Sequence, residues 1–151
     1  MAKDRQAIVT NRQAFRDYRV EKTYEAGLEL RGGEVKSLRG GKANLKGSFA
    51  RVENGEIFLY GMHISPYEYD REDYDPKRPR KLLLHKVQIR QLEVKSAQQG
   101  YALVPMKIYF SRGYAKVEIG LAVGKKLYDK RTALKEKQAK REIDRALYRK
   151  R

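Results

Sequence analysis

The sequence predicts a mainly β protein: a small closed antiparallel β-barrel of about six strands, with two or three short flanking helices and a basic C-terminal tail. Three observations support this prediction. Several short segments alternate apolar and polar residues, which is the two-residue period of a half-buried strand. Asn54-Gly55 and Ser111-Arg112-Gly113 separate such segments as hairpin turns do. Helical spacing is confined to short stretches before Gly124, after which the composition becomes strongly basic.

The first predicted elements are a brief helix and a strand. Asn11 is suited to cap a helix over residues 12–18, because its side-chain oxygen can accept a hydrogen bond from a free backbone N–H. Residues 18–30 are predicted to form a strand, since Leu28 and Leu30 alternate with charged residues at its end.

Two glycine pairs bracket the next element. Gly32-Gly33 and Gly40-Gly41 are predicted to form tight turns, because glycine adopts backbone angles that other residues avoid. Between them the spacing predicts a short helical segment whose Val35 and Leu38 face the interior.

The outward face of this helical segment carries Lys36 and Arg39, which are also three residues apart. Two cations on the exposed side of a compact element are suited to contact phosphate groups. An ordinary solvated helix face is the alternative, and the segment alone does not decide between them.

The middle of the chain is predicted to contain a hairpin followed by a loop. Residues 48–64 have the pattern of a hairpin that turns at Asn54-Gly55, with residues 57–64 as the returning strand. Residues 65–80 contain prolines, tyrosines and mixed charges with few apolar residues, which is typical of a loop. An apolar run, KLLLH, follows at residues 81–85.

A helix and a second hairpin complete the predicted body. The helix carries Val87 to Ala97 and stops at Gly100. Residues 101–110 and 114–123 are predicted to pair as a hairpin. Pro105 in the first of these strands predicts an edge position or a bulge, because proline has no N–H to donate. Together the hairpins indicate a barrel of the kind that the OB-fold represents.

The net charge of +16, from 35 Lys and Arg against 19 Asp and Glu, predicts a polyanionic partner. A membrane surface is also anionic, but basic segments that bind membranes usually add a strong amphipathic helix or a lipid anchor. No lipidation motif is present in this sequence. Nucleic acid is therefore the favoured partner.

The absence of cysteine excludes disulfides, thiolate metal sites and cysteine nucleophiles, and it fits a reducing compartment. No apolar run approaches the length that spans a bilayer, and residues 1–15 lack the apolar centre of a secretory signal. We therefore expect a soluble, cytoplasmic protein with no membrane partner.

Residues 124–151 differ in composition from the rest of the chain. Twelve basic and four acidic residues give them a charge of +8 (12 − 4), half of the net charge. Ala139, Ile143, Ala146 and Leu147 form an apolar stripe that is too narrow to dock firmly on a barrel. We expect residues 1–123 to form a nucleic-acid-binding barrel, and residues 124–151 to be disordered alone and helical against an anionic partner.

Candidates for catalysis are weak. The acidic group Asp70, Glu72, Asp73 and Asp75 could hold Mg²⁺ for a nuclease, but neighbouring cations would neutralise it. The two histidines lie beside apolar segments and are interpreted as structural. No nucleophile elbow and no glycine-rich phosphate loop is present. We expect no catalytic residue, no metal and no cofactor.

Tyrosines interleaved with cations offer a further possibility. Tyr18, Tyr24, Tyr67, Tyr69 and Tyr74 present π-faces, and stacking on a base contributes about 1–3 kcal/mol. Most of the eleven tyrosines are nevertheless expected in the core or at the barrel rim.

Five motifs, in order along the chain, resemble one protein family. They are EAGLELRGGEVKSLRGGKANL (25–45), HISPYE (63–68), DPKRPRKLLLH (75–85), LVPMKIYF (103–110) and GKKLYDKR (124–131). Together they resemble the bacterial SsrA-binding proteins, the small protein B family. Gly33 departs from the Thr or Trp that is frequent at this position in the family.

This resemblance implies an RNA-binding adaptor rather than an enzyme. Members of the family bind the tRNA-like domain of transfer-messenger RNA (tmRNA, or SsrA RNA). With elongation factor Tu and GTP they bring the alanyl-tmRNA to ribosomes stalled on truncated messages. The resemblance also implies a barrel similar to the OB-fold, and a tail that enters the 16S rRNA decoding centre and becomes helical in the empty mRNA channel. The expected partners are tmRNA and the ribosome, and the protein is expected to be a monomer.

The resemblance also implies site residues, since Asn11, Glu25 and Leu83 fall at tmRNA-contacting positions of the family. The expected RNA-binding residues are Asn11, Arg12, Tyr24, Glu25, Lys36, Arg39, Lys81 and Leu83. The expected residues of the decoding-centre and mRNA-channel tail are Gly124, Lys125, Lys126, Tyr128, Asp129, Lys130 and Arg131. Because a carboxylate repels phosphate, Glu25 must accept hydrogen bonds from a base edge or orient a neighbouring cation.

Two other functions remain open from the residues. One is a basic ribosomal protein with an OB-like body and an extended tail. The other is an RNA-processing enzyme that uses the acidic group within residues 70–75.

Overall fold

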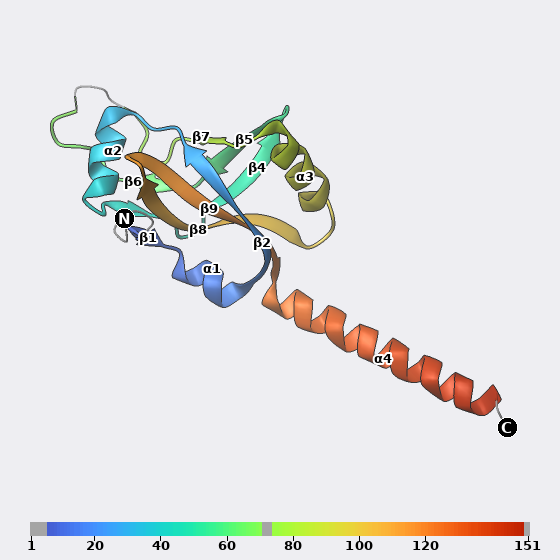
Figure 1. Cartoon of the computed structure of the whole chain (residues 1–151). Helices are drawn as coiled ribbons and strands as arrows, with labels where there is room; N and C mark the ends of the chain where they lie inside the picture. The colour runs from blue at the N-terminus through green and yellow to red at the C-terminus, as the bar shows by residue number, and fades with distance from the viewer. Residues whose placement is uncertain (1–5, 71–73, 150–151) are drawn as a thin grey trace.

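The computed structural model describes residues 6–70 and 74–149, and these residues contain nine strands and four helices. The strands are β1 (Val9–Thr10), β2 (Tyr18–Leu28), β3 (Ala43–Asn44), β4 (Phe49–Glu53), β5 (Glu56–Tyr60), β6 (His63–Ile64), β7 (Arg80–Leu83), β8 (Tyr101–Ser111) and β9 (Tyr114–Gly124). The helices are α1 (Arg12–Asp17), α2 (Gly32–Arg39), α3 (Lys86–Ser96) and α4 (Lys125–Arg149) (Figure 1).

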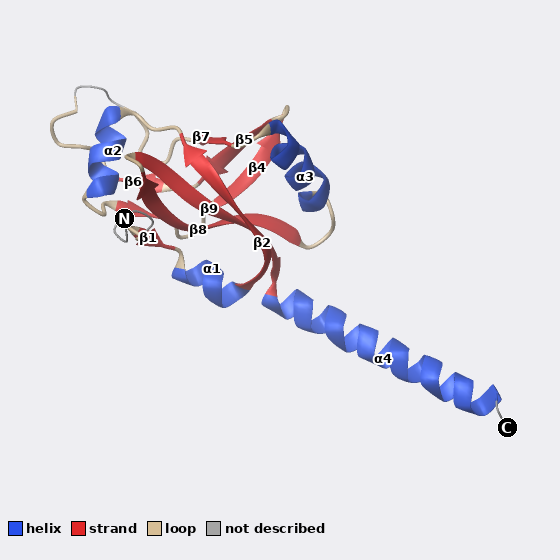
Figure 2. Ribbon diagram, viewed as in Figure 1, coloured by secondary structure: helices blue, strands red, loops and turns tan. Residues whose placement is uncertain are grey.

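All strand pairs of the described residues are antiparallel. The main sheet has the order β1-β8-β4-β5-β7-β2-β9, and β8 additionally pairs with β9, so the pairing returns to β8. β3 and β6 form a separate pair (Figure 2). The prediction of a mainly β protein with antiparallel hairpins and flanking helices is confirmed.

Both predicted hairpin turns are present. Asn54 and Gly55 have φ angles of +50° and +78°, and Arg112 and Gly113 have φ angles of +53° and +82°. Two successive residues with positive φ match the right-handed twist of the paired strands, which is why such turns favour asparagine and glycine. These turns fix the register of β4 with β5 and of β8 with β9.

Pro105 marks a bulge rather than an edge. β8 pairs with β9 on one side and with β1 and β4 on the other, and its register with β9 shifts between Pro105 and Lys107. The amide group of Asn11 donates to the Pro105 carbonyl at 2.9 Å, while the Asn11 side-chain oxygen accepts from the N–H of Ala14. The bulge thus anchors the cap of α1, and the predicted capping role of Asn11 is confirmed.

The predicted turn at Gly32-Gly33 is wrong, because both residues belong to the first turn of α2. The Glu34 carboxylate accepts a hydrogen bond from the Arg31 N–H at 2.9 Å, so the helix is capped before these glycines. Gly33 lies against the side chain of Asp70: a Cβ atom there would overlap its carboxylate, so a larger residue would require that side chain to move. The turn after the helix is present, since Gly41 has φ of +71°.

The returning strand of the first hairpin is shorter than the predicted range of residues 57–64. β5 ends at Tyr60, and Gly61 has φ of +80°. A Cβ atom on Gly61 would lie 3.3 Å from the carbonyl oxygen of Gly47, so glycine also permits this close backbone approach. The chain turns here, and β6 pairs with β3 instead of β4.

The core is enclosed by the sheet, α2 and α3. Ile57, Val117 and Ile119 from the strands pack with Leu38 of α2 and Leu92 of α3, and all five are fully buried. A smaller cluster of four buried residues joins α1 to β8 and β9. Helices on the outside of the sheet are therefore fixed by apolar burial, which positions the side chains on their outward faces.

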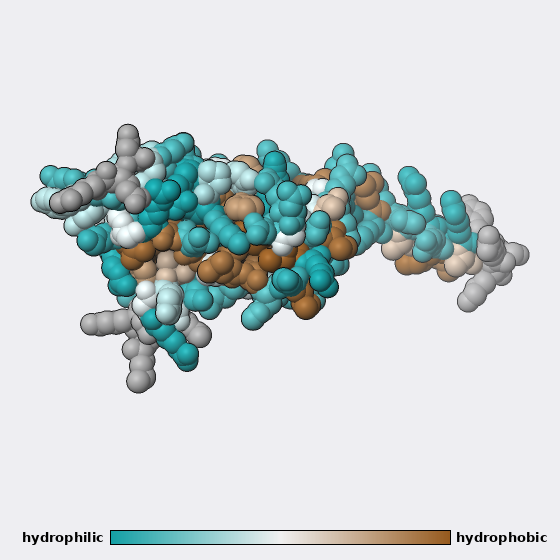
Figure 3. Space-filling view, turned by 90° about the horizontal axis from the view of Figure 1, so that it is seen from above, coloured by the Kyte–Doolittle hydropathy of each residue, from teal (hydrophilic) through white to brown (hydrophobic). Residues whose placement is uncertain are grey.

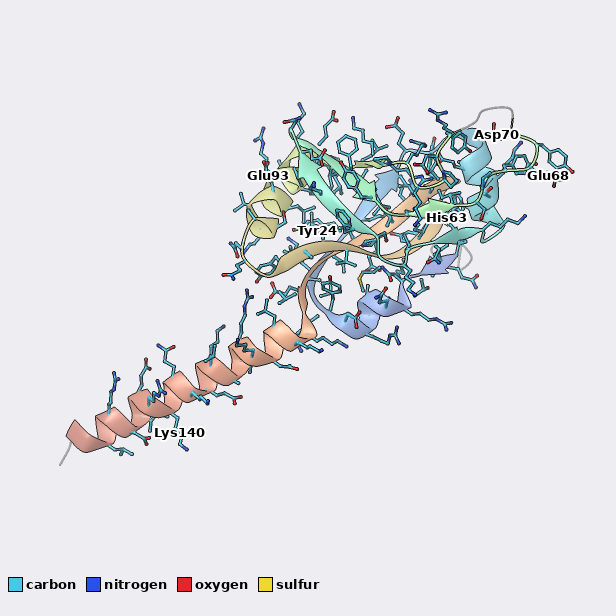
Figure 4. The ribbon with its side chains drawn as sticks, turned by 180° about the vertical axis from the view of Figure 1, so that it is seen from behind. Tyr24, His63, Glu68, Asp70, Glu93 and Lys140 are labelled. Atoms are coloured by element: carbon cyan, nitrogen blue, oxygen red, sulfur yellow. The ribbon has the colours of Figure 1, made fainter. Side chains whose placement is uncertain are left out.

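α4 leaves the sheet directly after Gly124 and projects away from it as one long helix (Figure 1). The guanidinium group of Arg19 lies 4.3 Å from the centre of the Tyr128 ring, and the Arg131 guanidinium donates a hydrogen bond to the Gln99 carbonyl. Side chains 132–147 are nearly all exposed, and Figure 4 shows Lys140 pointing away from the body. None of the helices in the described ranges has the length and apolar character that crossing a bilayer requires.

Candidate nucleic-acid interface

A groove between β2, β7 and the start of α3 brings together Glu25, Lys81 and Leu83 from the predicted RNA-binding set. We call it the β7–α3 groove. It has a volume of 580 Å³, and its lining also includes Lys86 and Lys116, which were not predicted from the sequence. Lys116 is one of the charged residues that alternate with buried residues along β9. This alternation is the sequence pattern from which its outward position could have been predicted. Three lysines against the carboxylates of Glu25 and Glu56 leave this groove with a small net positive charge, which attracts phosphate.

Leu83 is an apolar side chain that remains 53% exposed at this groove. It lies opposite Gly27 in the pairing of β7 with β2, and a Cβ atom on Gly27 would lie 3.1 Å from the Cβ of Leu83. Gly27 therefore leaves room for the leucine side chain against the sheet. An exposed leucine among lysines is suited to pack on a base or ribose while the cations hold phosphates. Figure 3 shows hydrophobic residues lying between hydrophilic ones on the face of the molecule seen from above.

Glu25 is exposed on β2, and its carboxylate accepts a hydrogen bond from the hydroxyl of Tyr109. Its neighbour across the sheet is Glu118, whose carboxylate lies 3.6 Å from the Lys107 ammonium. Because Tyr109 is buried, its hydroxyl holds the Glu25 carboxylate in a fixed position. The carboxylate oxygens retain lone pairs that can accept from the amino edge of a base, which is the first of the two roles open to Glu25.

Lys81 forms an ion pair of 3.2 Å with Glu56 at the rim of the same groove. Both side chains are well exposed, so the pair adds little stability and its lysine can exchange to a phosphate.

Other members of the predicted RNA-binding set lie elsewhere. The Asn11 side chain is buried: its oxygen accepts from the Ala14 N–H and caps α1, and its NH2 group donates to the Pro105 carbonyl. Arg12 is exposed on α1. Tyr24 is only 6% exposed within the sheet, where Figure 4 labels it, and the Lys22 ammonium lies 5.0 Å from its ring centre. The structure thus gives Tyr24 a core position, and its ring is not open for stacking on a base.

Lys36 and Arg39 lie on α2, and both are exposed, as predicted. The Lys36 ammonium lies 5.0 Å from the ring centre of Tyr67. The Arg39 guanidinium lies 4.3 Å from the ring centre of Phe110 and donates to the Gly113 carbonyl at 3.4 Å. Arg39 therefore ties α2 to the β8–β9 turn. Figure 1 shows α2 and α3 at opposite ends of the sheet, so these cations form a patch separate from the β7–α3 groove.

A buried ion pair beneath α2 was not predicted from the sequence. Glu34 and Arg80 are both 0% exposed, and Nε and Nη2 of Arg80 lie 2.8 and 2.6 Å from one Glu34 oxygen. Arg80 also donates to the carbonyls of Met62 and Pro76, at 2.6 and 2.8 Å, and Arg78 pairs with the second Glu34 oxygen. The network joins α2 to the segment that leads into β7. The alternating charges within residues 65–80 did not indicate that Arg78 and Arg80 would pair with Glu34.

Burial by itself raises the pKa of Glu34. Hydrogen bonds from Arg78, from the Arg31 N–H and from Arg80 outweigh that effect and hold the pKa below its usual value. Glu34 is therefore ionised in the folded protein at neutral pH.

Within the acidic group of residues 70–75, the two described carboxylates, Asp70 and Asp75, accept hydrogen bonds from neighbouring residues. The Tyr74 hydroxyl donates to Asp70 at 2.9 Å, and burial together with this carboxylate raises the pKa of Tyr74 to about 12. Asp75 accepts from the N–H of Lys77 at 2.9 Å. Glu72 and Asp73 lie outside the described residues. Across residues 6–70 and 74–149, no group of three or more His, Asp or Glu side chains is arranged to hold a metal ion.

A second groove lies at the base of the tail, between α1, the β3–β4 turn and the start of α4. We call it the α1–α4 groove. It has a volume of 710 Å³, and Gly124, Lys125 and Lys126 from the predicted tail set line it together with Arg16 and Phe49. Among the other predicted tail residues, Tyr128 and Arg131 contact the body, whereas Asp129 and Lys130 are exposed.

Comparison with known proteins finds one family that matches almost the whole chain. The sequence model of the SmpB protein family matches residues 8–149. The SsrA-binding protein of Carboxydothermus hydrogenoformans is 55% identical over 141 residues, which cover 93% of this chain and 95% of that protein. The SsrA-binding protein of Bacillus cereus is 59% identical over 140 residues, with coverages of 92% and 90%.

A solved structure gives the same result for the fold. A chain from the structure described as "tmRNA-SmpB: a journey to the center of the bacterial ribosome" superimposes with a TM-score of 0.66 at 56% sequence identity. The match covers 77% of this chain and 82% of that one. From the family match over residues 8–149 and from these relatives, the chain belongs to the SmpB family of SsrA-binding proteins.

Proposed function

We propose that this protein is an RNA-binding adaptor that binds the tRNA-like domain of tmRNA and brings it to stalled ribosomes for trans-translation. The observation that carries the proposal is the family match over residues 8–149, with a fold neighbour that is SmpB from a structure of tmRNA-SmpB and the bacterial ribosome. The groove chemistry supports it, because Glu25, Lys81 and Leu83 combine a base-edge acceptor, a cation and an apolar surface.

The body of the protein would act as a rigid support for this recognition. We propose that the main sheet is a closed, OB-like barrel, which the pairing of β8 with both β4 and β9 supports. Asn11, Arg12 and the α2 cations Lys36 and Arg39 would extend the RNA contact beyond the β7–α3 groove. The family membership supports a non-enzymatic role, a cytoplasmic location, a monomeric state and delivery together with elongation factor Tu and GTP.

The tail has a separate role in this proposal. Gly124 to Arg131 occupy the decoding centre, and the remainder enters the empty mRNA channel as the helix α4. The structure shows residues 125–149 as the helix α4. We propose that this helix unfolds in the free protein, because side chains 132–147 gain little burial against the body and cations repel one another along it. Ribosomal RNA would neutralise those cations and stabilise the helix.

The direct test is a competition between a tRNA-shaped RNA that contains the tmRNA acceptor domain and a random RNA of equal length. At physiological ionic strength, about 0.15 M, the protein should prefer the tRNA-shaped RNA. Equal affinity would overturn the proposal. In cells, the protein should copurify with one small RNA, whereas a constitutive ribosomal protein would remain on salt-washed subunits and carry no such RNA.

The β7–α3 groove can be tested separately by Leu83→Ala. We expect affinity for the tRNA-shaped RNA to fall at least about fivefold, since the substitution removes apolar surface from the centre of an interface. Leu134→Ala is the matched control, because Leu134 is 57% exposed on α4, outside the groove. Equal affinities for the two variants would remove the groove from the interface.

A further inference from the structure

The first two turns of α4 are fixed to the body along one face of the helix. Leu127, Tyr128 and Arg131 are half-buried, whereas the side chains at 132–147 are exposed. The three half-buried positions lie on the same side of the helix, because one helical turn takes 3.6 residues. Burial of the helix therefore ends at Arg131, well beyond Gly124, where β9 ends.

Two of the supporting side chains come from the strands on either side of β9. Arg19 of β2 and Tyr101 of β8 both lie opposite Val123, near the end of β9. The Arg19 guanidinium lies 4.3 Å from the centre of the Tyr128 ring, and the Arg131 guanidinium lies 5.7 Å from the centre of the Tyr101 ring. The helix that continues from β9 is thus held by a contact from each neighbouring strand.

The turn between α3 and β8 supplies a third support. Gly100 in this turn has φ of +86°, and a Cβ atom there would overlap the side chain of Leu127. Leu127 therefore lies directly on the backbone of the turn. The Arg131 guanidinium also donates a hydrogen bond to the carbonyl of Gln99 in the same turn.

These contacts give residues 125–131 a source of stability that the rest of α4 lacks. Most helices in proteins are stabilised by packing of one face rather than by helix propensity, and a helix without such packing is marginal in water. Because the packing ends at Arg131, the stability of the helix should also fall there.

We propose that Arg19 and the turn between α3 and β8 are positioning elements, which hold residues 125–131 as a rigid extension of the body. The tail then becomes movable after Arg131 rather than at Gly124. The unfolding proposed above for the free protein is thereby narrowed to the part of α4 that follows Arg131.

The consequence for the adaptor rests on the proposed function. A segment that is held in one orientation binds with a smaller loss of conformational entropy than a flexible one. Asp129 and Lys130 are exposed on the docked turns, so they are presented in a fixed direction relative to the RNA-binding body. The supports thus align the start of the tail with the body before the ribosome is reached.

Hydrogen exchange of the free, full-length protein tests the docking without RNA or ribosomes. The amides of residues 129–132 should be at least about tenfold better protected than those of residues 138–147, because they open only when the docked turns open. Leu127→Ala should lower the protection of residues 129–132 about fivefold, since it removes packed apolar surface while alanine favours the helix. Arg19→Gln should lower it about two- to fivefold, which is the contribution of an exposed cation–π contact.

Each substitution has a matched control. Leu134→Ala matches Leu127→Ala, because Leu134 lies further along α4 and is 57% exposed. Arg90→Gln matches Arg19→Gln, because Arg90 is exposed on α3. Neither control should change the protection of the docked turns. Even exchange along α4 in the unsubstituted protein, or equal losses in a variant and its control, would overturn the proposal.

Tagging of nascent chains in a translation extract separates a positioning role from a merely structural one. At limiting protein concentration, Arg19→Gln and Leu127→Ala should each reduce tagging at least about twofold, while affinity for the tRNA-like domain stays within about twofold. Loss of protection with unchanged or faster tagging would overturn the positioning role. If the protein shows no preference for the tRNA-shaped RNA while protection still ends at Arg131, the adaptor function fails and the docked extension stands.

Discussion

Glu34 and Arg80 show how much of the stability of this protein rests on a single buried charge pair. Both side chains are fully buried, and Arg80 also satisfies the carbonyls of Met62 and Pro76. Removal of one partner leaves the other charge without compensation in a low-dielectric environment, which typically costs about 3–5 kcal/mol. Because Glu34 also caps α2, the same carboxylate determines where the Lys36 and Arg39 patch lies.

Glu34→Gln should therefore lower the free energy of unfolding by about 3–5 kcal/mol, since the Arg80 charge stays buried without its partner. Urea unfolding followed by circular dichroism measures this change. Glu56→Gln is the control, because the ion pair of Glu56 with Lys81 is exposed and contributes about 0–1 kcal/mol. Similar losses in the two variants would contradict the assigned role of Glu34.

The pH dependence of stability provides a second test at this residue. The folded-state pKa of Glu34 lies below the ordinary value of 4.5 that the unfolded chain has, so the unfolded state binds the proton first. The stabilisation by Glu34 is complete above that ordinary value and is lost as the pH falls through the folded-state pKa. The stability of the unsubstituted protein should thus decline in acid more steeply than that of Glu34→Gln. Parallel acid-unfolding curves would contradict this account.

At the scale of elements, α2 is held at both ends. Glu34 fixes its first turn through Arg80, and Arg39 fixes its last turn to Phe110 and the carbonyl of Gly113. Lys36 lies between these anchors with its ammonium over the ring of Tyr67. The two cations of the predicted phosphate patch therefore differ, because Arg39 is tied to the sheet whereas Lys36 lies over a loop tyrosine.

This difference predicts separate effects of the two substitutions. Lys36→Ala should leave the unfolding temperature nearly unchanged and reduce the salt slope of tmRNA-domain binding by up to about one, since one phosphate is no longer neutralised. Arg39→Ala should in addition lower stability by about 0.5–1 kcal/mol, because it removes the contacts of Arg39 with Phe110 and the Gly113 carbonyl, both in the β8–β9 hairpin, whereas Lys36 contacts only a loop tyrosine. Lys137→Ala on the tail serves as the control for net charge. A salt slope that is the same for Lys36→Ala and Lys137→Ala would exclude Lys36 from the RNA interface.

At the scale of the whole molecule, the sheet and α4 are joined only near the base of the helix in the described part of the chain. Tyr128 and Arg131 contact the body, and side chains 132–147 are nearly all exposed. Figure 1 shows the helix extending well beyond the sheet. The sheet therefore keeps its core without the tail, while the tail presents its charge at a distance from the β7–α3 groove.

Truncation after Gly124 should leave affinity for the tRNA-like domain within about twofold and change the unfolding temperature little, because α4 packs little against the core. Tagging of nascent chains in a translation extract should be abolished. Truncation after Arg131 is the informative comparison, since it keeps the contacts of Tyr128 and Arg131 with the body. Equal losses of binding and tagging on truncation after Gly124 would mean that the tail is itself a main anchor for tmRNA.

Local chemistry made several features of this protein predictable from sequence. Asn54-Gly55 specified a hairpin, and Asn11 specified the start of α1, because a turn or cap depends on residues within a few positions. The outward position of Lys36 and Arg39 followed from helical spacing in the same way. The turn at Gly32-Gly33 was misjudged, because both glycines lie within the first turn of α2. Its capping residue Glu34 is held by Arg80 from a distant segment, which local chemistry does not show.

The sequence by itself determined an antiparallel β protein of high positive charge, with a basic tail that is distinct from the body. The tertiary structure alone decided that Glu25, Lys81 and Leu83 share a groove, that Tyr24 is buried, and that Glu34 meets Arg80 across 46 residues. The physical reason is that hydrophobic periodicity reports which face of a strand or helix is buried. It carries no information about which strands become neighbours, and that order places distant side chains together.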